Sequence, residues 1–372
     1  MSSELPPFRI LVLNAGSSTL KYASFEGIES VSQGTIECKE QEIPSAVESL
    51  LKGRPWDAIA FRVVHGGSHL IAPTLITDKV LQELEQTIPL APLHQPPAIA
   101  AIRTVGDLHP HVPRIACFDT AFHATLPECE KRFAIPDRFY REGIRRYGFH
   151  GLSYESIASQ LPSISQRAAA GKTVVCHLGN GASLCGLEHG ISRYTTMGFT
   201  PIDGLIMGTR CGRLDVGVAI HWLRNGMEVQ TLETMLTKES GLHGLSGGIS
   251  DMRSLVANAS QDPRCALALD MFCGTVAKEI AAAATALGGL DGIVFTAGIG
   301  ENSSVVRQRV IERLAWLGAA LNDEANSKKD LSIHSQSSSV EIFRISTDEQ
   351  RVIASHTVDF LRQSHGESHR DA

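Results

Sequence analysis

Three short apolar runs along the chain each break off into glycine, alanine, asparagine or hydroxyl residues. They are Ile10–Leu13 before Asn14–Thr19, Val174–Leu178 before Gly179–Ser183, and Ile293–Thr296 before Ala297–Asn302. Apolar runs of this length that end in glycine are typical of buried strands. The first two runs stand about half a chain apart, and their likeness predicts that the two halves duplicate one supersecondary unit.

Apolar positions at the helical period predict amphipathic helices in the second half of the chain. They recur every third or fourth residue over Cys273–Leu287 and over Val305–Leu317. A last helix is expected to begin at Thr347, because Gln350 completes a capping-box pattern three residues later. The glycine-rich segment Gly241–Gly248 predicts a loop. Buried strands that alternate with such helices indicate an α/β protein.

Length and composition narrow the class of protein. With 43% hydrophobic and 20% charged residues, the chain is globular rather than disordered, collagen-like or coiled-coil. A single core stops growing at roughly 250–300 residues, so 372 residues predict two domains with a ligand cleft between them. The net charge of −6, without a dense basic run, argues against nucleic acid and anionic membranes. We therefore expect a small-molecule partner.

The N-terminus and the cysteines bear on location. Met1–Pro7 lacks a basic region followed by an apolar one, and the smoothest apolar stretch, Ile280–Leu290, is alanine-rich and ends at Asp291. We expect neither export nor a membrane span. The eight cysteines contain no C-x-x-C pair and sit mostly in apolar runs, which predicts buried, reduced thiols in the cytoplasm.

The three glycine-rich turns indicate a phosphate ligand. Such turns let the backbone approach a phosphate closely and direct N–H groups at it, so three of them suggest a polyphosphate. The alternative is that each turn closes a strand-to-helix connection and binds nothing. The sequence has neither the P-loop pattern nor the Rossmann glycine pattern, so a nucleotide would bind by another scheme.

Charged and titratable residues also occur inside apolar or glycine-rich surroundings. They are Arg62, His94, Asp119, His150 and Arg210. Two arginines, two histidines and an acid would form a site that receives an anion and stabilises added negative charge. The alternatives are a structural ion pair between Asp119 and an arginine, and histidines that serve a core or a turn.

Blocks of sequence identify a resemblance. They are Leu13–Lys21, Arg62–Gly67, Phe118–His123, Tyr147–Gly151, His177–Gly181, Met197–Pro201, Met207–Gly212, Phe295–Asn302 and Thr347–Glu349. In this order they resemble the acetate and propionate kinase family, within the superfamily of sugar kinases, heat-shock chaperones and actin. The likeness runs from Ile10 to about Phe360.

The resemblance implies a fold and an assembly. It implies an α/β protein of two duplicated actin-like ATPase (ribonuclease H-like) domains with a ligand cleft between them. The N-terminal domain would comprise residues 1–150 and 349–372, and the nucleotide-binding domain residues 151–348. The family resemblance also implies a homodimer.

The implied reaction is reversible transfer of the γ-phosphoryl group of ATP to the carboxylate of acetate, which gives acetyl phosphate and ADP. The ATP phosphates would lie against Lys21, His177, Leu178, Gly179, Asn180 and Gly181, and adenosine against Asp251, Met252, Arg253, Gly298, Ile299, Gly300, Glu301 and Asn302. Mg²⁺, with Mn²⁺ as the alternative, would be approached by Asn14 and Glu349. The other interpretation of Glu349 is a favourable acid in the first turn of a helix.

The resemblance also assigns the reacting groups. Asp119, His150 and Arg210 would be catalytic, and acetate would meet Arg62, Val64, Leu93, His94, Phe149 and Pro201. Of these, Val64, Leu93, Phe149 and Pro201 would line the methyl pocket. The family analogy makes Asp119 an acid or proton-transfer group. Acetate carries no proton to remove, so orientation of an arginine or of a metal-bound water is the alternative role.

Four positions depart from the family pattern. They are Phe61 and Tyr154, where the family usually has His, Tyr194, where it has Asp, and Val216, where it has Pro. None is a residue assigned to phosphate, metal or carboxylate, so we expect effects on rate and dimer contacts rather than on the reaction.

Two rival functions remain at this point. A propionate or other short-chain acyl kinase differs only in the volume around Val64 and Phe149. A chaperone-like or actin-like ATPase would keep the nucleotide turns but would have no use for a carboxylate site. Four residues together argue against that ATPase: Arg62, Asp119, His150 and Arg210.

Overall fold

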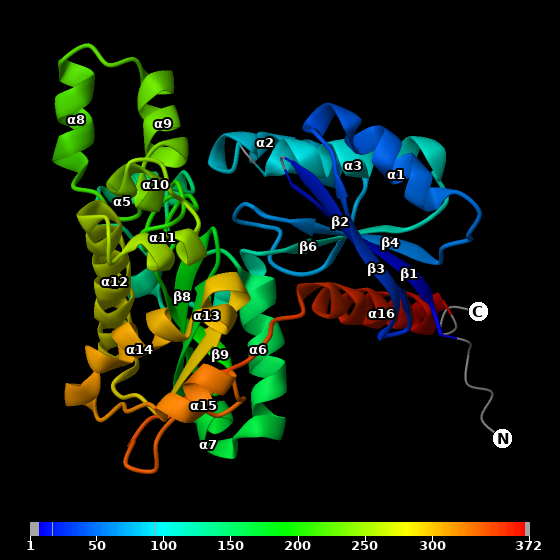
Figure 1. Ribbon diagram of the computed structural model, residues 1–372. Helices are drawn as coiled ribbons and strands as arrows, with labels where there is room; N and C mark the ends of the chain where they lie inside the picture. Colours follow the sequence, from blue (N-terminus) through cyan, green and yellow to red (C-terminus); the bar gives the residue numbers. More distant parts are fainter. Residues whose placement is uncertain (1–6, 17, 93, 369–372) are drawn as a thin grey trace. The chain divides into compact units, whose positions relative to one another are not determined.

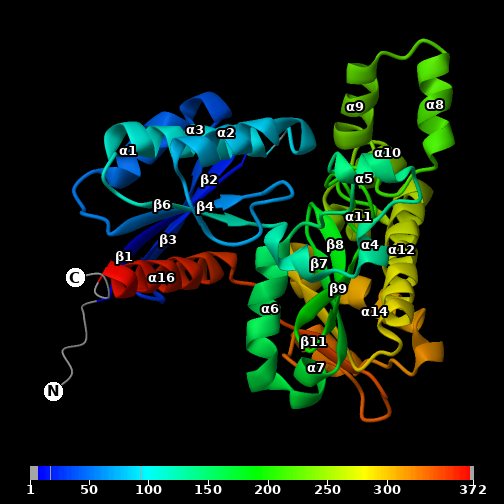
Figure 2. The same ribbon diagram turned by 180° about the vertical axis from the view of Figure 1, so that it is seen from behind.

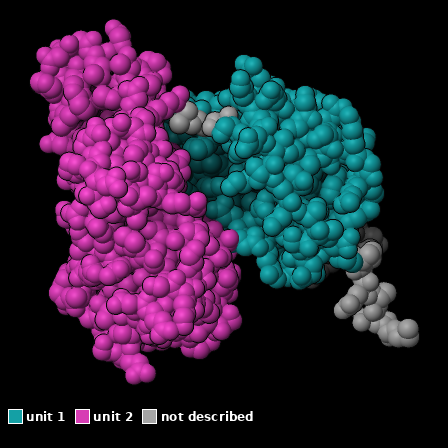
Figure 3. All heavy atoms as spheres, in the orientation of Figure 1, with its two compact units in different colours: residues 1–124, 149–152, 348–372 teal, residues 125–148, 153–347 magenta. Residues whose placement is uncertain are grey.

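The structure, a computed structural model, describes residues 7–16, 18–92 and 94–368. The chain divides into two compact units, coloured separately in Figure 3. Unit 1 comprises residues 1–124, 149–152 and 348–372, and unit 2 comprises residues 125–148 and 153–347.

A mixed six-stranded sheet forms the centre of unit 1, in the order β3-β2-β1-β4-β6-β5. Its strands are β1 (Arg9–Ala15), β2 (Thr19–Glu26), β3 (Glu29–Glu37), β4 (Ala58–Val63), β5 (Thr74–Leu75) and β6 (Arg114–Phe118). The helices of this unit are α1 (Ile43–Leu51), α2 (Asp78–Gln86), α3 (Gln95–Leu108) and α16 (Glu349–Ser368). Helices α1, α2 and α3 lie on one face of the sheet and α16 on the other (Figures 1 and 2).

The alternation of side chains along β1 explains why both faces of this sheet are covered. Leu11 and Leu13 belong to the apolar cluster that includes α1 and α3, whereas Ile10 and Val12 belong to the cluster that includes α16. Successive residues of a strand point to opposite faces, so an uninterrupted apolar strand needs helices on both sides. The apolar run of β1 is therefore completed by a helix from the other end of the chain.

Unit 2 repeats this arrangement around a second sheet, in the order β11-β10-β7-β8-β9. Its strands are β7 (Lys172–Leu178), β8 (Ala182–Glu188), β9 (Ile191–Thr195), β10 (Gly292–Thr296) and β11 (Glu341–Arg344). In each sheet the central strand pairs antiparallel with the next strand and parallel with a later one, β1 with β2 and β4, and β7 with β8 and β10. The duplication predicted from the sequence is thus confirmed.

The long helix α12 (Pro263–Leu287) packs on β7, β8 and β9. The other helices of unit 2 are α4 (Glu128–Lys131), α5 (Asp137–Arg141), α6 (Gly151–Ile164, from residue 153 on), α7 (Gln166–Ala170), α8 (Val216–Arg224), α9 (Val229–Lys238), α10 (Gly241–Ser246), α11 (Met252–Asn258), α13 (Ala297–Asn302), α14 (Ser304–Glu312) and α15 (Asp323–Lys328). Short 3₁₀ turns span Glu40–Glu42, Ile88–Leu90, Ala121–Thr125 and Ala315–Leu317. In the described part of the chain, no helix combines the length and apolar character that crossing a bilayer requires.

Three local predictions need correction. The helix predicted from Cys273 begins earlier, at Pro263, where Asp262 caps it by accepting from the Arg264 N–H at 2.8 Å. The helix predicted over 305–317 ends at Glu312 and is followed by a 3₁₀ turn. The predicted loop at 241–248 is wrong, because residues 241–246 form α10.

The start of the last helix also differs by one residue. Asp348 caps α16 by accepting from the Arg351 N–H at 3.0 Å. The hydroxyl of Thr347, the predicted cap, donates instead to the Ser153 carbonyl at 3.4 Å. A tertiary partner has therefore replaced the local one.

Segment 125–148, which the sequence analysis assigned to the first domain, packs within unit 2. The Tyr147 N–H donates to the Gly198 carbonyl at 3.0 Å. Arg146 Nη1 donates to the Thr196 and Met197 carbonyls, both at 3.2 Å. These hydrogen bonds hold the segment to the turn that follows β9.

Candidate active site

In unit 1, β4 carries Arg62 between two carboxylates. Arg62 Nε and Nη2 donate to the two oxygens of Asp119 at 3.0 and 2.7 Å, and Nη1 lies 3.0 Å from Glu349 Oε2. Asp119 follows β6, the neighbour of β4, and Glu349 begins α16. The Arg62 side chain is 18% exposed and that of Asp119 only 1%. The strand pairing and the last helix thus bring together three residues that the sequence predicted separately.

This cluster sets the charge of Arg62. Burial by itself lowers the pKa of the guanidinium, and the Asp119 and Glu349 carboxylates outweigh that effect, so the pKa is raised above its ordinary value. The bidentate fork also satisfies both oxygens of a buried Asp119, which would otherwise be costly. Arg62 is therefore a permanent cation with a fixed orientation.

The backbone around Asp119 is joined to the segment that carries Phe149 and His150. The Gly151 N–H donates to the Asp119 carbonyl at 2.9 Å, and a Cβ on Gly151 would lie 2.1 Å from that oxygen. Only glycine fits there. His150 has φ +59°, a left-handed conformation that is uncommon for a residue with a side chain. His123 Nε2 donates to the Phe149 carbonyl at 3.0 Å, so this turn is held on both sides.

His65 is a functional candidate that the sequence analysis did not single out beyond its block. It is fully buried, and its ring packs edge-on against Phe149 with centroids 5.6 Å apart. The Gly67 N–H donates to His65 Nδ1 at 2.9 Å, so the ring proton of the neutral form is on Nε2. Burial lowers the pKa of His65 to about 4. The imidazole beside Phe149 is therefore neutral at physiological pH.

The remaining predicted residues of unit 1 lie on nearby elements. Asn14 and Lys21 are register partners on β1 and β2, so their side chains stand on the same face. Val64 directly follows β4 and is partly buried. His94 precedes α3 and donates its N–H to the Ala91 carbonyl at 3.0 Å. Leu93 lies outside the described residues.

In unit 2, Arg210 lies on a loop that contacts the turn after β7. The Gly208 N–H donates to the Asn180 carbonyl at 3.0 Å, and a Cβ on Gly208 would lie 2.1 Å from Asn180 Oδ1. Arg210 Nη1 donates to the Pro201 carbonyl at 2.7 Å. The structure thus brings the predicted phosphate turn and one predicted catalytic arginine to neighbouring segments of the same unit.

The surroundings of Arg210 differ from those of Arg62. Within residues 7–16, 18–92 and 94–368, no carboxylate lies at ion-pair distance from it, and burial lowers the pKa of its guanidinium below the ordinary value. Arginine stays protonated well above neutral pH, so a desolvated cation remains. Such a group is stabilised by an anion that binds to it.

A pocket of about 590 Å³ opens beside the same turn, in unit 2. Its lining comprises Gly179, Asn180, Ser250, Asp251, Met252, Arg253, Val256, Gly298, Ile299, Asn302, Ser303, Ser304 and Val305. Three predicted nucleotide segments, 179–180, 251–253 and 298–302, therefore meet in one pocket, whose volume is in the range of small-molecule sites. The lining does not include His177, Leu178, Gly181, Gly300 or Glu301, and Lys21 belongs to unit 1.

Sequence analysis missed Arg307, which fixes the wall of this pocket. Arg307 is fully buried and donates to the carbonyls of Gly300 and Glu301 at 2.8 and 3.0 Å and to Asn326 Oδ1 at 2.7 Å. Asn326 Nδ2 donates in turn to the Ser304 carbonyl at 3.1 Å. One signal was available, since Arg307 shares a helix face with Val310, where a charge is unexpected.

The four positions expected to depart from the family pattern have different environments. Phe61 is in the apolar cluster of unit 1, and the hydroxyl of Tyr154 hydrogen-bonds Ser183 Oγ. The hydroxyl of Tyr194 donates to Glu279 at 2.7 Å, whereas Val216, on α8, is 72% exposed.

Comparison with known proteins identifies the family of this chain. The model of the acetokinase family matches residues 45–355. The acetate kinase of Methylocella silvestris is 43% identical over 95% of this chain and 98% of its own length. Among solved structures, a propionate kinase from Francisella tularensis is 34% identical with a TM-score of 0.86, over 94% of this chain and 98% of that one. The acetate kinase of Porphyromonas gingivalis is 30% identical with a TM-score of 0.84, over 95% and 99%. The chain therefore has the duplicated actin-like ATPase fold and belongs to the acetokinase family of carboxyl-acceptor phosphotransferases.

Proposed function

We propose that this protein transfers the γ-phosphoryl group of ATP reversibly to the carboxylate of acetate, by direct in-line displacement. The observation that carries the proposal is Arg62, a permanent cation that Asp119 and Glu349 hold by three of its five N–H groups. The other N–H groups can bind a carboxylate, as the arginine fork does well. Membership of the acetokinase family supports the same reaction.

The proposed reaction requires that acetate be held in position, and it requires no general base to deprotonate it. Acetate is already ionised at neutral pH, since carboxylic acids titrate near pH ~4. We propose that Asp119 orients Arg62 instead of moving a proton, because both of its oxygens accept hydrogen bonds from that guanidinium. A pH profile tests this role. Asp119→Asn should lower kcat to a similar degree across the neutral range, whereas loss of one limb of the profile would favour proton transfer.

We propose that ATP occupies the pocket of unit 2 and that Arg210 and His150 stabilise the charge on the transferred group. The transition state of phosphoryl transfer spreads negative charge over three equatorial oxygens. Arg210, a desolvated cation next to the turn at Asn180, is suited to these oxygens. Its hydrogen bond to the Pro201 carbonyl uses one N–H of the guanidinium, so other N–H groups can bind a ligand.

The residues proposed for Mg²⁺ are suited to it by their donor atoms. Asn14 and Glu349 both offer oxygen, and Mg²⁺ prefers a small number of protein oxygens together with water and substrate phosphates. Among the described residues no group of three or more His, Cys, Asp or Glu side chains could hold a metal, and this mode of binding requires none. When bound, the metal would neutralise charge on the phosphates. Mn²⁺, with the same ligand preference, is the alternative.

Val64, His94 and Phe149 in unit 1, together with Leu93 and Pro201, are proposed to bind the acyl group. Phe149 is buried against His65, so the wall that it forms is fixed. The rival function, a propionate kinase, would need a larger space beside Val64 and Phe149. Solved relatives of similar identity include both an acetate and a propionate kinase.

One assay tests the whole proposal. Acyl phosphate is trapped as the hydroxamate after incubation with Mg²⁺, a phosphoryl donor and acetate, propionate or butyrate. We expect the highest kcat/KM with acetate and ATP. No hydroxamate with any acid would refute the kinase function, a propionate preference would favour the rival, and formation from pyrophosphate would replace ATP as the donor.

We also propose that the protein is a homodimer and that α8 contributes to the interface. No residue of α8 is buried, and its apolar residues Val216, Ile220 and Leu223 are 72%, 42% and 41% exposed. Their spacing of four and three puts them on one helix face. Light scattering should show a dimer that Val216→Lys/Ile220→Lys converts to monomer, and a monomeric parent protein would contradict this.

A cytoplasmic location is part of the proposal. All eight cysteines are free thiols, and six of them are buried, which fits a reducing compartment. Cell fractionation with antibody detection tests it.

A further inference from the structure

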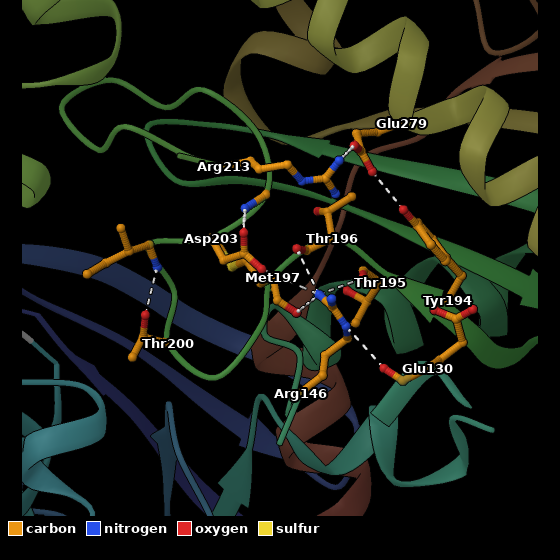
Figure 4. A network of polar contacts seen from close by, with 12 residues as sticks. Glu130, Arg146, Tyr194, Thr195, Thr196, Met197, Thr200, Asp203, Arg213 and Glu279 are labelled. Atoms are coloured by element: carbon orange, nitrogen blue, oxygen red, sulfur yellow. Dashed lines mark hydrogen bonds and ion pairs between the residues drawn. The ribbon is translucent and has the colours of Figure 1, made fainter. Parts of the chain in front are cut away.

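A buried glutamate on α12 connects three segments of unit 2 near the loop that carries Arg210. Glu279 is 5% exposed, and each of its carboxylate oxygens has a different partner (Figure 4). Oε2 accepts a hydrogen bond from the hydroxyl of Tyr194, on β9, at 2.7 Å. Oε1 lies 2.9 Å from Arg213 Nη1. A buried carboxylate is tolerated when it is both paired and hydrogen-bonded, so these two contacts fix Glu279.

Arg213 closes the base of the Arg210 loop. Its N–H donates to the Gly204 carbonyl at 2.9 Å. Gly212, with φ +71°, approaches so closely that a Cβ would lie 2.4 Å from the Leu205 carbonyl oxygen. The two ends of the loop are thus joined backbone to backbone, with Arg210 between them. The position of Arg210 consequently depends on where Arg213 is held.

Through Glu279, Tyr194 connects Arg213, at the end of the Arg210 loop, to the C-terminal end of β9. Burial and the hydrogen bond to Glu279 raise the pKa of the Tyr194 phenol, which therefore remains a donor at neutral pH. The carbonyls just after Tyr194 accept hydrogen bonds from Arg146 Nη1, and Arg146 Nε donates to the Glu130 carbonyl at 3.1 Å (Figure 4). These hydrogen bonds fix the end of β9, and with it the position of the Tyr194 phenol.

We propose that Tyr194, Glu279 and Arg213 form a positioning relay that holds Arg210 in the orientation needed for phosphoryl transfer. The three residues act through Arg210 rather than on the substrate, so this inference rests on the role proposed for Arg210.

The first test removes a single hydrogen bond. Tyr194→Phe keeps the ring and should lower kcat about 3- to 10-fold while the KM for ATP stays within about twofold, because the pocket lining is untouched. Tyr140→Phe is the matched control, since it removes a phenol–glutamate hydrogen bond of 3.0 Å, to Glu128, elsewhere in unit 2. It should leave kcat unchanged. A wild-type kcat in Tyr194→Phe would overturn the relay.

The second test asks whether the effect passes through Arg210. In an Arg210→Ala background, adding Tyr194→Phe should cause no further loss of the residual kcat. A further loss of about 3- to 10-fold in that background would overturn the relay and leave the role of Arg210 intact. Full activity of Arg210→Ala alone would overturn that role and the relay with it.

A third test covers the case in which Tyr194→Phe does not fold. The Arg213 side chain is 63% exposed, so its replacement opens no cavity, and the Tyr194 hydroxyl still donates to the buried Glu279 carboxylate. Arg213→Met should reproduce the loss in kcat, and Arg213→Lys, which keeps the charge beside Glu279, should recover most of it. A lower melting temperature with unchanged kcat in Arg213→Met would assign the contact to stability alone and overturn the relay.

Discussion

Arg62 in unit 1 and Arg210 in unit 2 are both partly buried, and the chain holds them in opposite ways. Arg62 contacts two carboxylates of its own unit, Asp119 and Glu349, and its pKa is raised. Arg210 donates to the Pro201 carbonyl, and its pKa is lowered by burial. The first cation is stabilised before any substrate arrives, whereas the second gains its counter-charge from an anion that binds.

This difference indicates that the two arginines have different roles in the proposed reaction. Arg62 carries one positive charge between two carboxylates, and its two remaining N–H groups are suited to orient an acetate ion without binding it too tightly. An arginine without a counter-charge is suited to a group whose negative charge grows in the transition state.

The largest effects are expected from removing the two arginines. Arg62→Ala and Arg210→Ala should each lower kcat at least 10²-fold, because each removes a charge-assisted contact of about 3 kcal/mol. The two variants should differ in their free energy of unfolding. Arg62→Ala takes the guanidinium away from the buried Asp119 carboxylate and should cost about 3 kcal/mol of unfolding free energy, whereas Arg210→Ala should cost little.

Steady-state kinetics and urea denaturation measure both effects. Retention of more than about a tenth of the activity by both variants would contradict the assignment. Equal stability losses in the two variants would remove the contrast between the two arginines.

Acid should weaken unit 1 through His65. The folded pKa of about 4 lies below the ordinary value of 6.5, so the unfolded chain binds more protons between these two values. This contribution to stability is complete above pH ~6.5 and is lost as the pH falls toward ~4, by about 3 kcal/mol at most. Urea denaturation followed by Trp56 fluorescence in a Trp222→Phe/Trp316→Phe variant reports unit 1. An acid loss of the same size in His65→Gln would show that another group titrates.

Substrate choice should respond to Val64, which stands two residues after Arg62. Val64→Ala opens room for one methylene, worth about 0.8 kcal/mol on burial, and total discrimination is about 1–3 kcal/mol. The ratio of kcat/KM for propionate over acetate should rise on the order of 10-fold, mostly through a lower KM for propionate. Val31→Ala, at a valine of the same unit that is 53% exposed, is the control. An unchanged ratio would remove Val64 from the acyl pocket.

The smallest effect is expected at Glu349, which contacts Arg62 and is proposed to bind Mg²⁺. Glu349→Ala should raise the Mg²⁺ concentration for half-maximal rate several-fold, because it removes one oxygen ligand while Asn14, water and the substrate phosphates remain. Asp323→Ala is the matched control, because Asp323 is an acid in the first turn of another helix, α15. If Glu349→Ala lowers the melting temperature without changing the Mg²⁺ dependence, the carboxylate only stabilises its helix.

Features with a local cause could be predicted from the sequence. The apolar runs that became β1, β7 and β10 end in glycine turns, and both signals lie within a few residues of each other. The duplication followed from these runs, whereas the family resemblance rested on sequence blocks spread along the whole chain.

Features with a distant cause could not be predicted. Gly241–Gly248 has a loop-like composition, yet residues 241–246 form α10, because the N–H groups of Leu242 and His243 bond the carbonyls of the Arg210 loop. The cap of α16 moved from Thr347 to Asp348 because the Thr347 hydroxyl found Ser153. In both places a partner far along the chain outweighed the local preference.

The sequence by itself determined the residue types of the site, since an arginine in an apolar strand or an acid after one is visible without coordinates. Only the tertiary structure decided their partners and hence their charge behaviour. Asp119 orients Arg62, and the buried His65 is a neutral imidazole. Arg307 hydrogen-bonds the backbone that forms the pocket wall. Burial and hydrogen bonding depend on which distant groups folding brings within about 3 Å, and a local pattern does not contain that information.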